Sequence, residues 1–432
     1  MMSASPPLPL PPGIGKPLPQ AIRLLSMDGG GIYGYITALM LRALCAEDPN
    51  FLSPLAYQPE QATLGWIERP GAVWAFAGTS AGSLNALLLA NAEDPRAFVT
   101  SGQLEAFWLN SGAIFAPPSM QDGPMGMLRY WMSYWSLVGW FGTAEYERFL
   151  RDHFGDRTLG QLKHRVLLTS FNWTGEPSGR WRPKVFVNFP ARREPDRQMP
   201  IWQAAYLATS PPGLRQVRWG FGDGGTASPD PSLSVLVELI RIGRREAAKS
   251  LKSTASRASR DRVLADEISP VLKNARLLSV GVCSKIPAYE RANFDFGSLM
   301  FNALPTNPSR QNYWPPMWQI SIDPATESSV ATCQALLGAR CHRLDPDLLG
   351  PPAEPPTLAA TMLARNPMWR QHLIERQQIA MQTPEARAAV QAAATFLREW
   401  WSPEKPHLPG PPDVRAPQPP EPPFAPSTDD GP

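Results

Sequence analysis

The sequence predicts an α/β fold in which a mostly parallel sheet is sandwiched by helices and carries helical insertions. Apolar runs of strand length alternate with helical stretches along most of the 432-residue chain, and this alternation is typical of parallel sheets covered by helices. Hydrophobic residues make up 43% of the chain, enough for a sizeable core. The formal net charge is only +3, so we expect no nucleic-acid partner held by overall charge.

The expected strands are short apolar runs bounded by turn-forming residues. They cover residues 22–27, 72–77, 166–171, 185–189, 217–221, 277–282 and 318–322. The first two runs each lead through a glycine cluster into a helical pattern, the first through Ile36, Leu39, Met40 and Leu44 and the second over 84–91. A further helix is expected over 233–240.

Both ends of the chain are rich in proline. Residues 1–20 hold 7 prolines and residues 402–432 hold 12, so 19 of the 50 prolines lie in the two tails. Proline removes backbone donors and disfavours helix in the residue before it, so we expect disordered tails. Between them we expect one domain over 21–345, with insertions at about 107–142 and 241–270, followed by a helical extension over 346–401.

The four cysteines, Cys45, Cys283, Cys333 and Cys341, form no CxxC pair. This spacing argues against a disulfide framework or a zinc site, and we expect no metal or other cofactor. The first residues lack a basic segment followed by an apolar stretch, which a secretory signal would need. No apolar run is long enough to span a bilayer. We therefore expect a cytoplasmic protein, with peripheral membrane association as an addition.

The segment Gly78-Thr79-Ser80-Ala81-Gly82 matches G-x-S-x-G and lies directly between the apolar run 72–77 and a small-residue helix. This strand–turn–helix context is what a nucleophile elbow requires. A sharp turn crowds the backbone around the serine, and the two flanking glycines relieve that crowding. The hydroxyl would then lie at a helix N-terminus, where the dipole favours negative charge. A turn that merely packs a helix against the sheet is the structural alternative.

A second glycine cluster, Asp28-Gly29-Gly30-Gly31-Ile32-Tyr33-Gly34, follows the run 22–27 and contains G-x-G-x-x-G. In a Rossmann loop an acidic residue ends the next strand about 20 residues beyond the motif. Here Glu47 and Asp48 close a helical stretch instead. The other functional interpretation is an oxyanion hole, in which consecutive glycines direct backbone N–H groups into one small space. A plain glycine turn that leads into a helix is the third interpretation.

A third motif, Gly222-Asp223-Gly224-Gly225, follows the run 217–221. A nucleophilic serine needs a proton acceptor. Asp223 would serve in a dyad with Ser80 if burial raises its pKa. The order Ser, Asp, His also permits a triad that His342 or His372 completes.

In this order, the three motifs resemble those of the patatin-like phospholipase family over roughly residues 20–345. The segments 202–210 and 278–281 resemble two further landmarks of that family. The resemblance implies that Ser80 is the nucleophile, that Asp223 is the base, and that Gly29, Gly30 and Gly31 shape the oxyanion hole. It also implies a patatin-like sheet sandwiched by helices, and hydrolysis of acyl esters in lipids without a metal. The supporting motif positions are Asp28, Gly34, Gly78, Gly82, Gly224 and Gly225.

The sequence departs from the family pattern at three places. Tyr33 stands where the family usually has arginine or lysine, which removes a positive charge beside the anion site. Residues 211–212 and 229–231 are proline-rich where the family has alanine and Asn-Asn-Pro, and we expect these changes to alter loop stiffness. None of the departures removes a reacting atom.

Two segments outside the motifs bear on access and regulation. Twelve of the 17 residues from 125 to 141 are apolar or aromatic, and Arg129 is the single charge. This composition favours a lid or a membrane-docking helix, with a buried helix or a homodimer contact as alternatives.

Residues 241–262 hold eight basic and two acidic side chains. They suit anionic lipid or an anionic small-molecule activator, and a solvated helix face is the alternative.

The sequence thus predicts a metal-independent serine lipid acyl hydrolase that acts on phospholipid or another acyl-ester lipid at a membrane surface. One alternative is the same scaffold as a bacterial effector gated by a cyclic nucleotide or other anionic ligand. The other is a nucleotide-binding or interaction protein without catalysis.

Overall fold

The computed structural model of the chain describes residues 21–54, 71–119, 123–134, 139–175, 177–189, 195–250, 271–285, 316–349 and 357–401. The two proline-rich tails and the part of the basic insertion over 251–270 lie outside these residues.

Seven described strands form one sheet in the order β4-β3-β2-β1-β6-β7, with β5 beside β3. The pairs from β3 through β2, β1 and β6 to β7 are parallel, and β4 and β5 run antiparallel to β3. The strands are β1 (Ile22–Met27), β2 (Ala75–Gly78), β3 (Arg165–Asn172), β4 (Arg182–Val187), β5 (Phe221–Asp223), β6 (Ala275–Val280) and β7 (Cys341–Leu344). The predicted mostly parallel sheet is confirmed.

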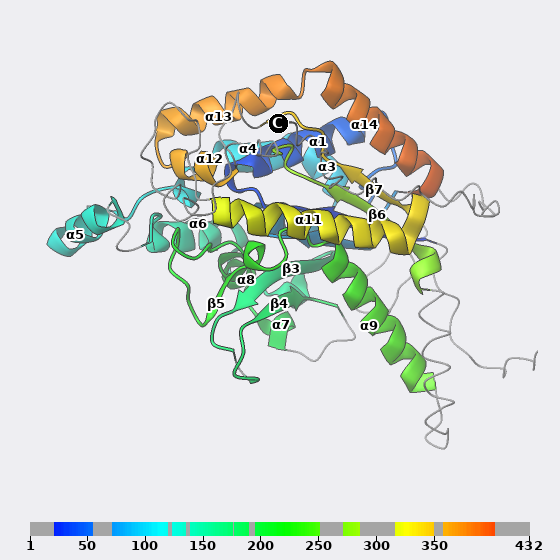
Figure 1. Cartoon of the computed structure of the whole chain (residues 1–432), viewed down its shortest axis with the longest axis horizontal. Coiled ribbons are helices and arrows are strands. Elements are labelled where there is room, and N and C mark those ends of the chain that lie inside the picture. Colours follow the sequence, from blue (N-terminus) through cyan, green and yellow to red (C-terminus); the bar gives the residue numbers. More distant parts are fainter. Residues whose placement is uncertain are drawn as a thin grey trace, which may run out of the picture.

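Helices cover both faces of this sheet, as predicted (Figure 1). Leu25 and Met27 of β1 lie in a core shared with α1, α2, α8 and α14, whereas Ile22 and Leu24 lie in a second core with α9 and α11. This division follows from the alternation of side chains along a strand. The α-helices are α1 (Gly34–Glu47), α2 (Ala81–Asn91), α3 (Pro95–Thr100), α4 (Gln103–Leu109), α5 (Gly123–Tyr134), α6 (Thr143–Phe154), α7 (Pro195–Gln198), α8 (Ile201–Ala208), α9 (Ser232–Ser250), α11 (Pro316–Leu337), α12 (Thr357–Leu363), α13 (Pro367–Ala380) and α14 (Pro384–Phe396).

Two strand predictions differ from the structure. The strand expected over 318–322 is wrong, because these residues lie in the 22-residue helix α11, which begins at Pro316. A short apolar run does not distinguish a strand from a buried helix, and proline suits the first turn of a helix. The strand expected over 217–221 begins only at Phe221, because Trp219 and Gly220 have φ values of 50° and 75° and form a turn.

The parallel strands bring the predicted motifs to one edge of the sheet. Met27 pairs with Gly78 of β2 on one side and with Val280 of β6 on the other. The carboxyl ends of these three strands are therefore level, and the segments that follow each of them lie together. Ligand sites of open α/β sheets form at this edge.

The helical extension predicted over 346–401 contains α12, α13 and α14, and α13 and α14 run along the top of the molecule in Figure 1. None of the described helices combines the length and the apolar character needed to cross a bilayer.

Candidate active site

Ser80 lies at a tight turn between β2 and α2. Its backbone has φ 50° and ψ −120°, a conformation that is strained for a residue with a side chain. A Cβ atom at Gly82 would collide with the Met27 carbonyl, and one at Gly78 would collide with the carbonyl of Gly82. Both flanking glycines are thus required by the closeness of the backbone, and the turn leaves Ser80 partly exposed at the start of α2.

The structure brings Ser80 and Asp223 together. The Ser80 hydroxyl donates a hydrogen bond of 2.6 Å to Oδ2 of Asp223, although the two residues come from different strand ends. The other carboxylate oxygen, Oδ1, accepts a 2.7 Å hydrogen bond from the Gly225 amide. The Asp223 amide donates to the Ser210 carbonyl at 3.0 Å, which fixes the carboxylate to the end of the 202–210 segment.

Asp223 is only 3% exposed, and this burial sets its proton affinity. Desolvation raises the pKa of Asp223 to about 6, although hydrogen bonds from Ser80 and Gly225 and the charge of Arg215 oppose the increase. A carboxylate with a pKa near the working pH is ionised at neutral pH and still holds a proton well enough to act as a general base.

Arg215 is a neighbour of this site that the sequence does not reveal. Its guanidinium is buried, packs 3.7 Å from the centre of the Tyr146 ring, and donates to the carbonyls of Ile114 and Thr209. Its positive charge lowers the pKa of Asp223. The residue lies in an irregular turn with no motif around it, so its role becomes visible only in three dimensions.

The first glycine of the cluster touches the serine. A Cβ atom built on Gly29 would lie 3.1 Å from Cβ of Ser80, so any residue larger than glycine would make a tight contact with the serine here. The Gly29 amide, however, donates to the Pro229 carbonyl at 3.0 Å. The Gly29 amide is therefore already used within the protein, and the expectation that the three glycines shape an oxyanion hole stays a prediction.

Gly30 and Gly31 donate to no acceptor within the described part of the chain. Their amides are therefore the members of the cluster that remain to bind an oxyanion. A side chain at Gly30 would collide with Val282, and one at Gly31, whose φ is +53°, would collide with Thr361. Close packing by the segment that follows β6 and by α12 explains why both positions need glycine. α1 ends at Glu47, so no acidic strand end of the Rossmann kind follows this cluster.

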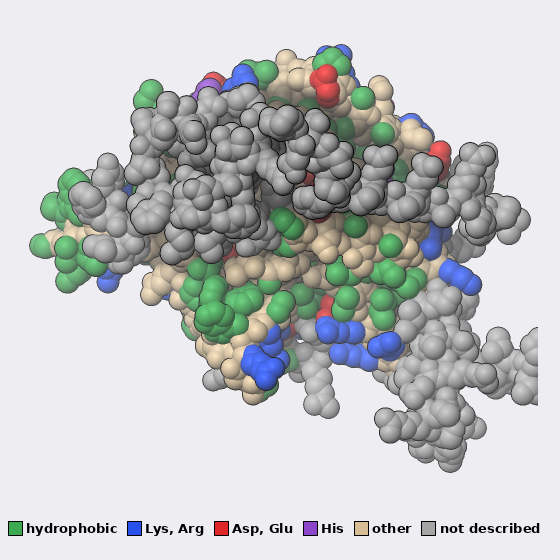
Figure 2. All heavy atoms as spheres, viewed as in Figure 1, with side chains coloured by type: hydrophobic (Ala, Val, Ile, Leu, Met, Phe, Trp, Pro, Cys, Tyr) green, Lys and Arg blue, Asp and Glu red, His purple; other side chains and the backbone are tan. Residues whose placement is uncertain are grey.

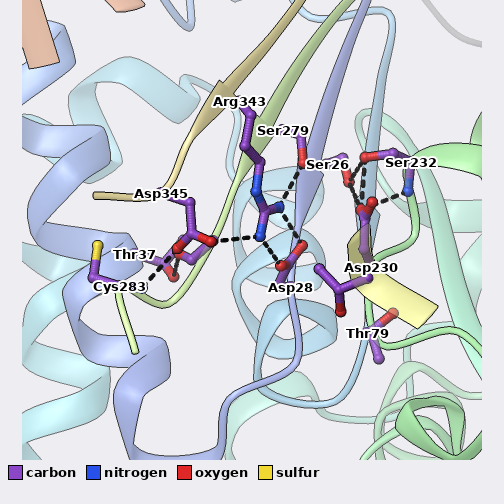
Figure 3. Close-up of polar contacts among 12 residues, drawn as sticks. Ser26, Asp28, Thr37, Thr79, Asp230, Ser232, Ser279, Cys283, Arg343 and Asp345 are labelled. Atoms are coloured by element: carbon purple, nitrogen blue, oxygen red, sulfur yellow. Dashed lines mark hydrogen bonds and ion pairs between the residues drawn. The ribbon is translucent and has the colours of Figure 1, made fainter. Parts of the chain in front are cut away.

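A buried ion network holds Asp28, the first residue of the glycine cluster (Figure 3). Arg343 of β7 donates to Oδ1 of Asp28 at 2.9 Å, to Ser279 at 2.8 Å and to Asp345 at 2.9 Å. Burial opposes the charged form of Arg343, but Asp28 and Asp345 outweigh it and keep the pKa of Arg343 well above its ordinary value. The motif aspartate Asp28 therefore acts as a structural anchor and does not contact Ser80 by a hydrogen bond.

The residues after Asp223 form a loop, 224–230, that contacts all three motifs. The Ser228 amide donates to the Gly224 carbonyl at 2.8 Å, the Ser228 carbonyl accepts from the Thr79 hydroxyl at 2.7 Å, and the Pro229 carbonyl accepts from Gly29. At the end of the loop, Oδ1 of Asp230 accepts hydrogen bonds from Ser26 and Ser232 (Figure 3). This loop, which we call the clamp loop, thus sets the relative positions of the glycine cluster, the serine turn and the aspartate.

The C-terminal extension also holds the glycine cluster. The Ile32 amide donates to the Thr361 hydroxyl at 3.3 Å, and the Ile36 amide donates to Oε1 of the buried Gln377 at 2.8 Å. The Gln377 amide group in turn donates to the Ile32 carbonyl at 3.4 Å. Nothing in the sequence around Thr361 or Gln377 indicates this role.

The two histidines considered for a triad have other neighbours. The His342 ring stacks on Phe396, and burial lowers its pKa. The His372 ring lies edge-to-face against Trp369. Among the described residues, no histidine donates to or accepts from Ser80 or Asp223. Within the same residues, no three His, Cys, Asp or Glu side chains are grouped to hold a metal ion.

The aromatic insertion forms the exposed helix α5. Figure 1 shows α5 projecting from the body, and Figure 2 shows hydrophobic side chains gathered on it. Met125, Met127, Leu128 and Trp131 are each 52–59% exposed, so the alternative of a buried helix is wrong. The body holds α5 near its end, where Arg365 donates to Ser133 at 3.1 Å.

An α/β sheet with a serine turn and a glycine cluster at its carboxyl edge defines a hydrolase-like class of protein. The comparison with known families is more specific. Residues 25–236 match the family model described as patatin-like phospholipase. Residues 25–236 therefore form a patatin-like phospholipase domain, as the three motifs predicted.

Relatives among characterised proteins agree with this assignment. The chain is 29% identical over 222 residues to the cGAMP-activated phospholipase of Pseudomonas aeruginosa (strain BWHPSA011 / Pa011), covering 50% of this chain and 56% of that protein. It is 24% identical over 211 residues to the putative sporulation hydrolase CotR of Bacillus subtilis (strain 168), covering 49% and 54%. The chain therefore matches just over half the length of these curated relatives.

Among solved structures, VipD from Legionella pneumophila covers 88% of this chain and 85% of its own, at 10% identity and a TM-score of 0.27. A TM-score this low carries no weight for the fold.

Proposed function

We propose that the protein is a metal-independent serine lipid acyl hydrolase of the phospholipase A type, with Ser80 as nucleophile and Asp223 as base. The observation that carries the proposal is the 2.6 Å hydrogen bond from the Ser80 hydroxyl to the buried Asp223 carboxylate. Beside it lies a glycine cluster in which two amides donate to no acceptor among the described residues. Family membership supports the choice of lipid esters as substrates.

In the first half-reaction, Ser80 Oγ attacks the ester carbonyl carbon while its proton passes to Oδ2 of Asp223. The amides of Gly30 and Gly31 donate to the oxyanion that forms, together with the positive end of α2. The intermediate collapses when the bond to the alcohol oxygen breaks and Asp223 returns its proton to the leaving alcohol. An acyl-enzyme on Ser80 remains.

In the second half-reaction, water attacks the acyl-enzyme carbonyl and gives a proton to Asp223. The same amides stabilise the second oxyanion. The proton then returns to Ser80 as the fatty acid leaves. Each half-reaction needs Asp223 ionised at its start, which its pKa of about 6 allows at neutral pH.

Access to lipid would occur through α5. Its exposed methionine, leucine and tryptophan side chains suit the interfacial region of a bilayer. The chain that leaves α5 is connected to the site, because the Phe141 amide donates to the Leu214 carbonyl at 2.7 Å, next to Arg215. This hydrogen bond links the segment after α5 to the segment that holds Arg215.

The test of catalysis is fatty-acid release from mixed phospholipid vesicles with a chelator present, followed by lipid mass spectrometry. We expect Ser80→Ala to abolish release, and a fluorophosphonate to label the wild-type protein at Ser80. Full activity of Ser80→Ala would refute the assignment, and loss of activity in His342→Ala with the fold intact would favour the triad. Absence of labelling would favour a non-catalytic interaction protein.

The test of membrane contact is co-sedimentation with vesicles. We expect Leu128→Gln/Trp131→Gln to bind vesicles far less than wild type, and Met368→Gln/Trp369→Gln to bind like wild type, because the second pair is exposed on α13. Equal binding of the two variants would refute a docking role for α5. A change from dimer to monomer in the first variant would favour a homodimer contact.

A second candidate is the same hydrolase under control of an anionic ligand. The Pseudomonas relative is named for activation by cGAMP, and Arg241, Arg244 and Arg245 are exposed on α9. Ester hydrolysis measured with and without cyclic nucleotides tests this candidate, and a rate that does not change would count against it.

A further inference from the structure

Arg215 is a buried cation in the segment between α8 and β5. Its guanidinium donates from Nη1 to the Thr209 carbonyl at 3.3 Å and from Nη2 to the Ile114 carbonyl. The Phe141 ring lies 5.6 Å from Cζ of Arg215, so both ends of the insertion that carries α5 contact this side chain. The protein thus encloses Arg215, which is only 3% exposed.

No described carboxylate meets this buried charge by direct contact. The described hydrogen bonds of Arg215 go to carbonyl oxygens, and its Nε atom is buried without a hydrogen-bond partner among the described residues. Burial lowers the pKa of Arg215, but an arginine in a protein still keeps its proton. A buried cation is unfavourable unless a negative charge lies near it.

Asp223 supplies that negative charge. The backbone holds the two side chains near each other, because the Thr209 carbonyl accepts from Arg215 and the next carbonyl, that of Ser210, accepts from the Asp223 amide at 3.0 Å. Desolvation is the largest influence on the pKa of each group. Against it, the carboxylate raises the pKa of Arg215 and the guanidinium lowers the pKa of Asp223. Each charge therefore favours the ionised form of the other.

The other ionisable side chains around this network lie on α6, on α8 and in the turn before β5: Tyr146, Glu147, Tyr206 and Arg218. Burial raises the pKa of Tyr146 to about 12, so its phenol is neutral below pH 10. Arg218 and Glu147 form a salt bridge of 2.5 Å with each other. Arg215 is the cation that acts on Asp223.

We propose that Arg215 is a positioning residue that keeps Asp223 ionised and serves as the counter-charge when the negative charge passes to the oxyanion. This role rests on the proposed hydrolase function. Before the reaction, the negative charge is on Asp223. Once Ser80 has given its proton to Asp223 and attacked the ester, Asp223 is neutral and the negative charge is on the oxyanion. With Arg215 the total is zero at both stages, so the reaction moves charge within a buried site and creates none.

The first test is the pH profile of kcat/KM with a soluble short-chain p-nitrophenyl ester. Arg215→Met keeps an apolar stem and removes the charge. We expect its acid limb to move to higher pH by at least about half a unit, because an adjacent cation lowers a carboxyl pKa by about 1–3 units. Tyr146→Phe removes the hydroxyl that bonds Thr209 at 2.6 Å without changing charge, and its acid limb should match wild type. A lower rate in Arg215→Met without a shifted limb would overturn the proposal.

Arg215→Lys tests the counter-charge in a site that stays positively charged at neutral pH, and it decides the question if Arg215→Met does not fold. The ordinary pKa of lysine is about 10.4, and burial lowers it. We expect an acid limb like that of wild type and a new loss of activity below pH 10, which wild type does not show. Asp223 is ionised at that pH in both proteins, so the loss reports on the oxyanion. A profile parallel to wild type up to pH 10 would overturn this role.

Stability separates this proposal from the proposed function. Urea unfolding at pH 7.5 gives the gain in stability from Asp223→Asn, once in the wild-type background and once with Arg215→Met. Without the cation the buried carboxylate is less favourable, so the gain should be larger by a factor of at least about three in the unfolding equilibrium constant, the equivalent of half a pKa unit. Equal gains would overturn the pairing of the two charges. If wild type hydrolyses no ester while the gains differ, the hydrolase function fails and the pairing stands.

Discussion

Replacing Asp223 with asparagine should remove activity and at the same time stabilise the fold. Asparagine has nearly the shape of aspartate, and its oxygen can still accept from the Gly225 amide, while its NH2 group can donate to Ser80 Oγ. What the substitution removes is the proton acceptor. A positioned general base typically contributes a factor of about 10² to 10⁴ in rate, so turnover of a soluble ester should fall by at least about a hundredfold.

The expected gain in stability follows from the pKa of the buried carboxyl group. Burial raises the pKa of Asp223 from 3.8 to about 6. Above pH 6 the group is ionised in both the folded and the unfolded chain, and the folded chain bears the cost of the buried charge. Two pKa units correspond to about 3 kcal/mol. Below pH 4 the group is protonated in both states and the cost disappears, so this group lowers the free energy of unfolding as the pH rises from 4 to 6.

Asparagine carries no charge at any of these pH values. The free energy of unfolding of Asp223→Asn should therefore exceed that of wild type by about 3 kcal/mol at pH 7.5, and by about 1 kcal/mol at pH 4.5. Urea unfolding at the two pH values measures this difference. Ser80→Ala is the matched control, because it also removes activity but leaves the buried carboxyl group in place, and it should show no such gain.

Two results would refute this reasoning independently. If Asp223→Asn retained more than a tenth of the wild-type turnover, Asp223 would not be the base. If its stability relative to wild type were the same at both pH values, the pKa of Asp223 would not be raised, and burial would not be the cause of its basicity.

Three further predictions concern the same site. For the wild-type protein with a soluble ester, kcat/KM should rise about tenfold per pH unit below pH 6 and level off above it, because the base must be ionised; a flat profile from pH 4.5 to 8 would contradict this. Gln377→Leu leaves the Ile36 amide without an acceptor, so the free energy of unfolding in urea should fall by about 1–3 kcal/mol and kcat should fall. Gln391→Leu makes the same change at an exposed position of α14 and should behave like wild type. Arg343→Leu leaves Asp28 buried without its cation, so the free energy of unfolding in urea should fall by about 3–5 kcal/mol. A decrease below 1 kcal/mol would show that the ion network does not support the cluster.

Ser80 and Asp223, the proposed reacting groups, could be found from the sequence because their positions depend on short local patterns. Gly78 and Gly82 are needed wherever a strand turns this sharply into a helix, since any side chain there collides with backbone. The same holds for Gly31, which has a positive φ. Such requirements are visible in the sequence as glycines that lie within a few residues of Ser80 and Asp223.

The supporting residues could not be found in this way. Arg343 lies 315 residues from Asp28, and Gln377 lies 341 residues from Ile36. An arginine or glutamine on a strand or helix has no local pattern that indicates which distant loop it will reach. The partner of the Gly29 amide could not be found either, because Pro229 lies 200 residues away in the chain.

Secondary structure shows a related limit. The apolar run 318–322 has the composition of a buried strand, yet it lies in α11, and the polar strand β7, Cys341–Leu344, was not expected. In both cases the neighbours decide the outcome. β7 pairs in parallel with β6, and this pairing places Arg343 beside Asp28, so polar character at this edge strand serves the ion network.

The residues that form the candidate site and the residues that support it lie in different parts of the chain. The matched region, 25–236, contains the serine turn, the glycine cluster, the aspartate and the clamp loop. The residues that hold the cluster from the other side, Val282, Arg343, Thr361 and Gln377, all lie beyond it. Reacting atoms are constrained by chemistry and so keep a recognisable pattern, whereas a support needs only to fill a space or donate a hydrogen bond, and many sequences can do so. The support that Val282, Arg343, Thr361 and Gln377 give to the cluster therefore comes from the part of this chain that lies beyond the matched region.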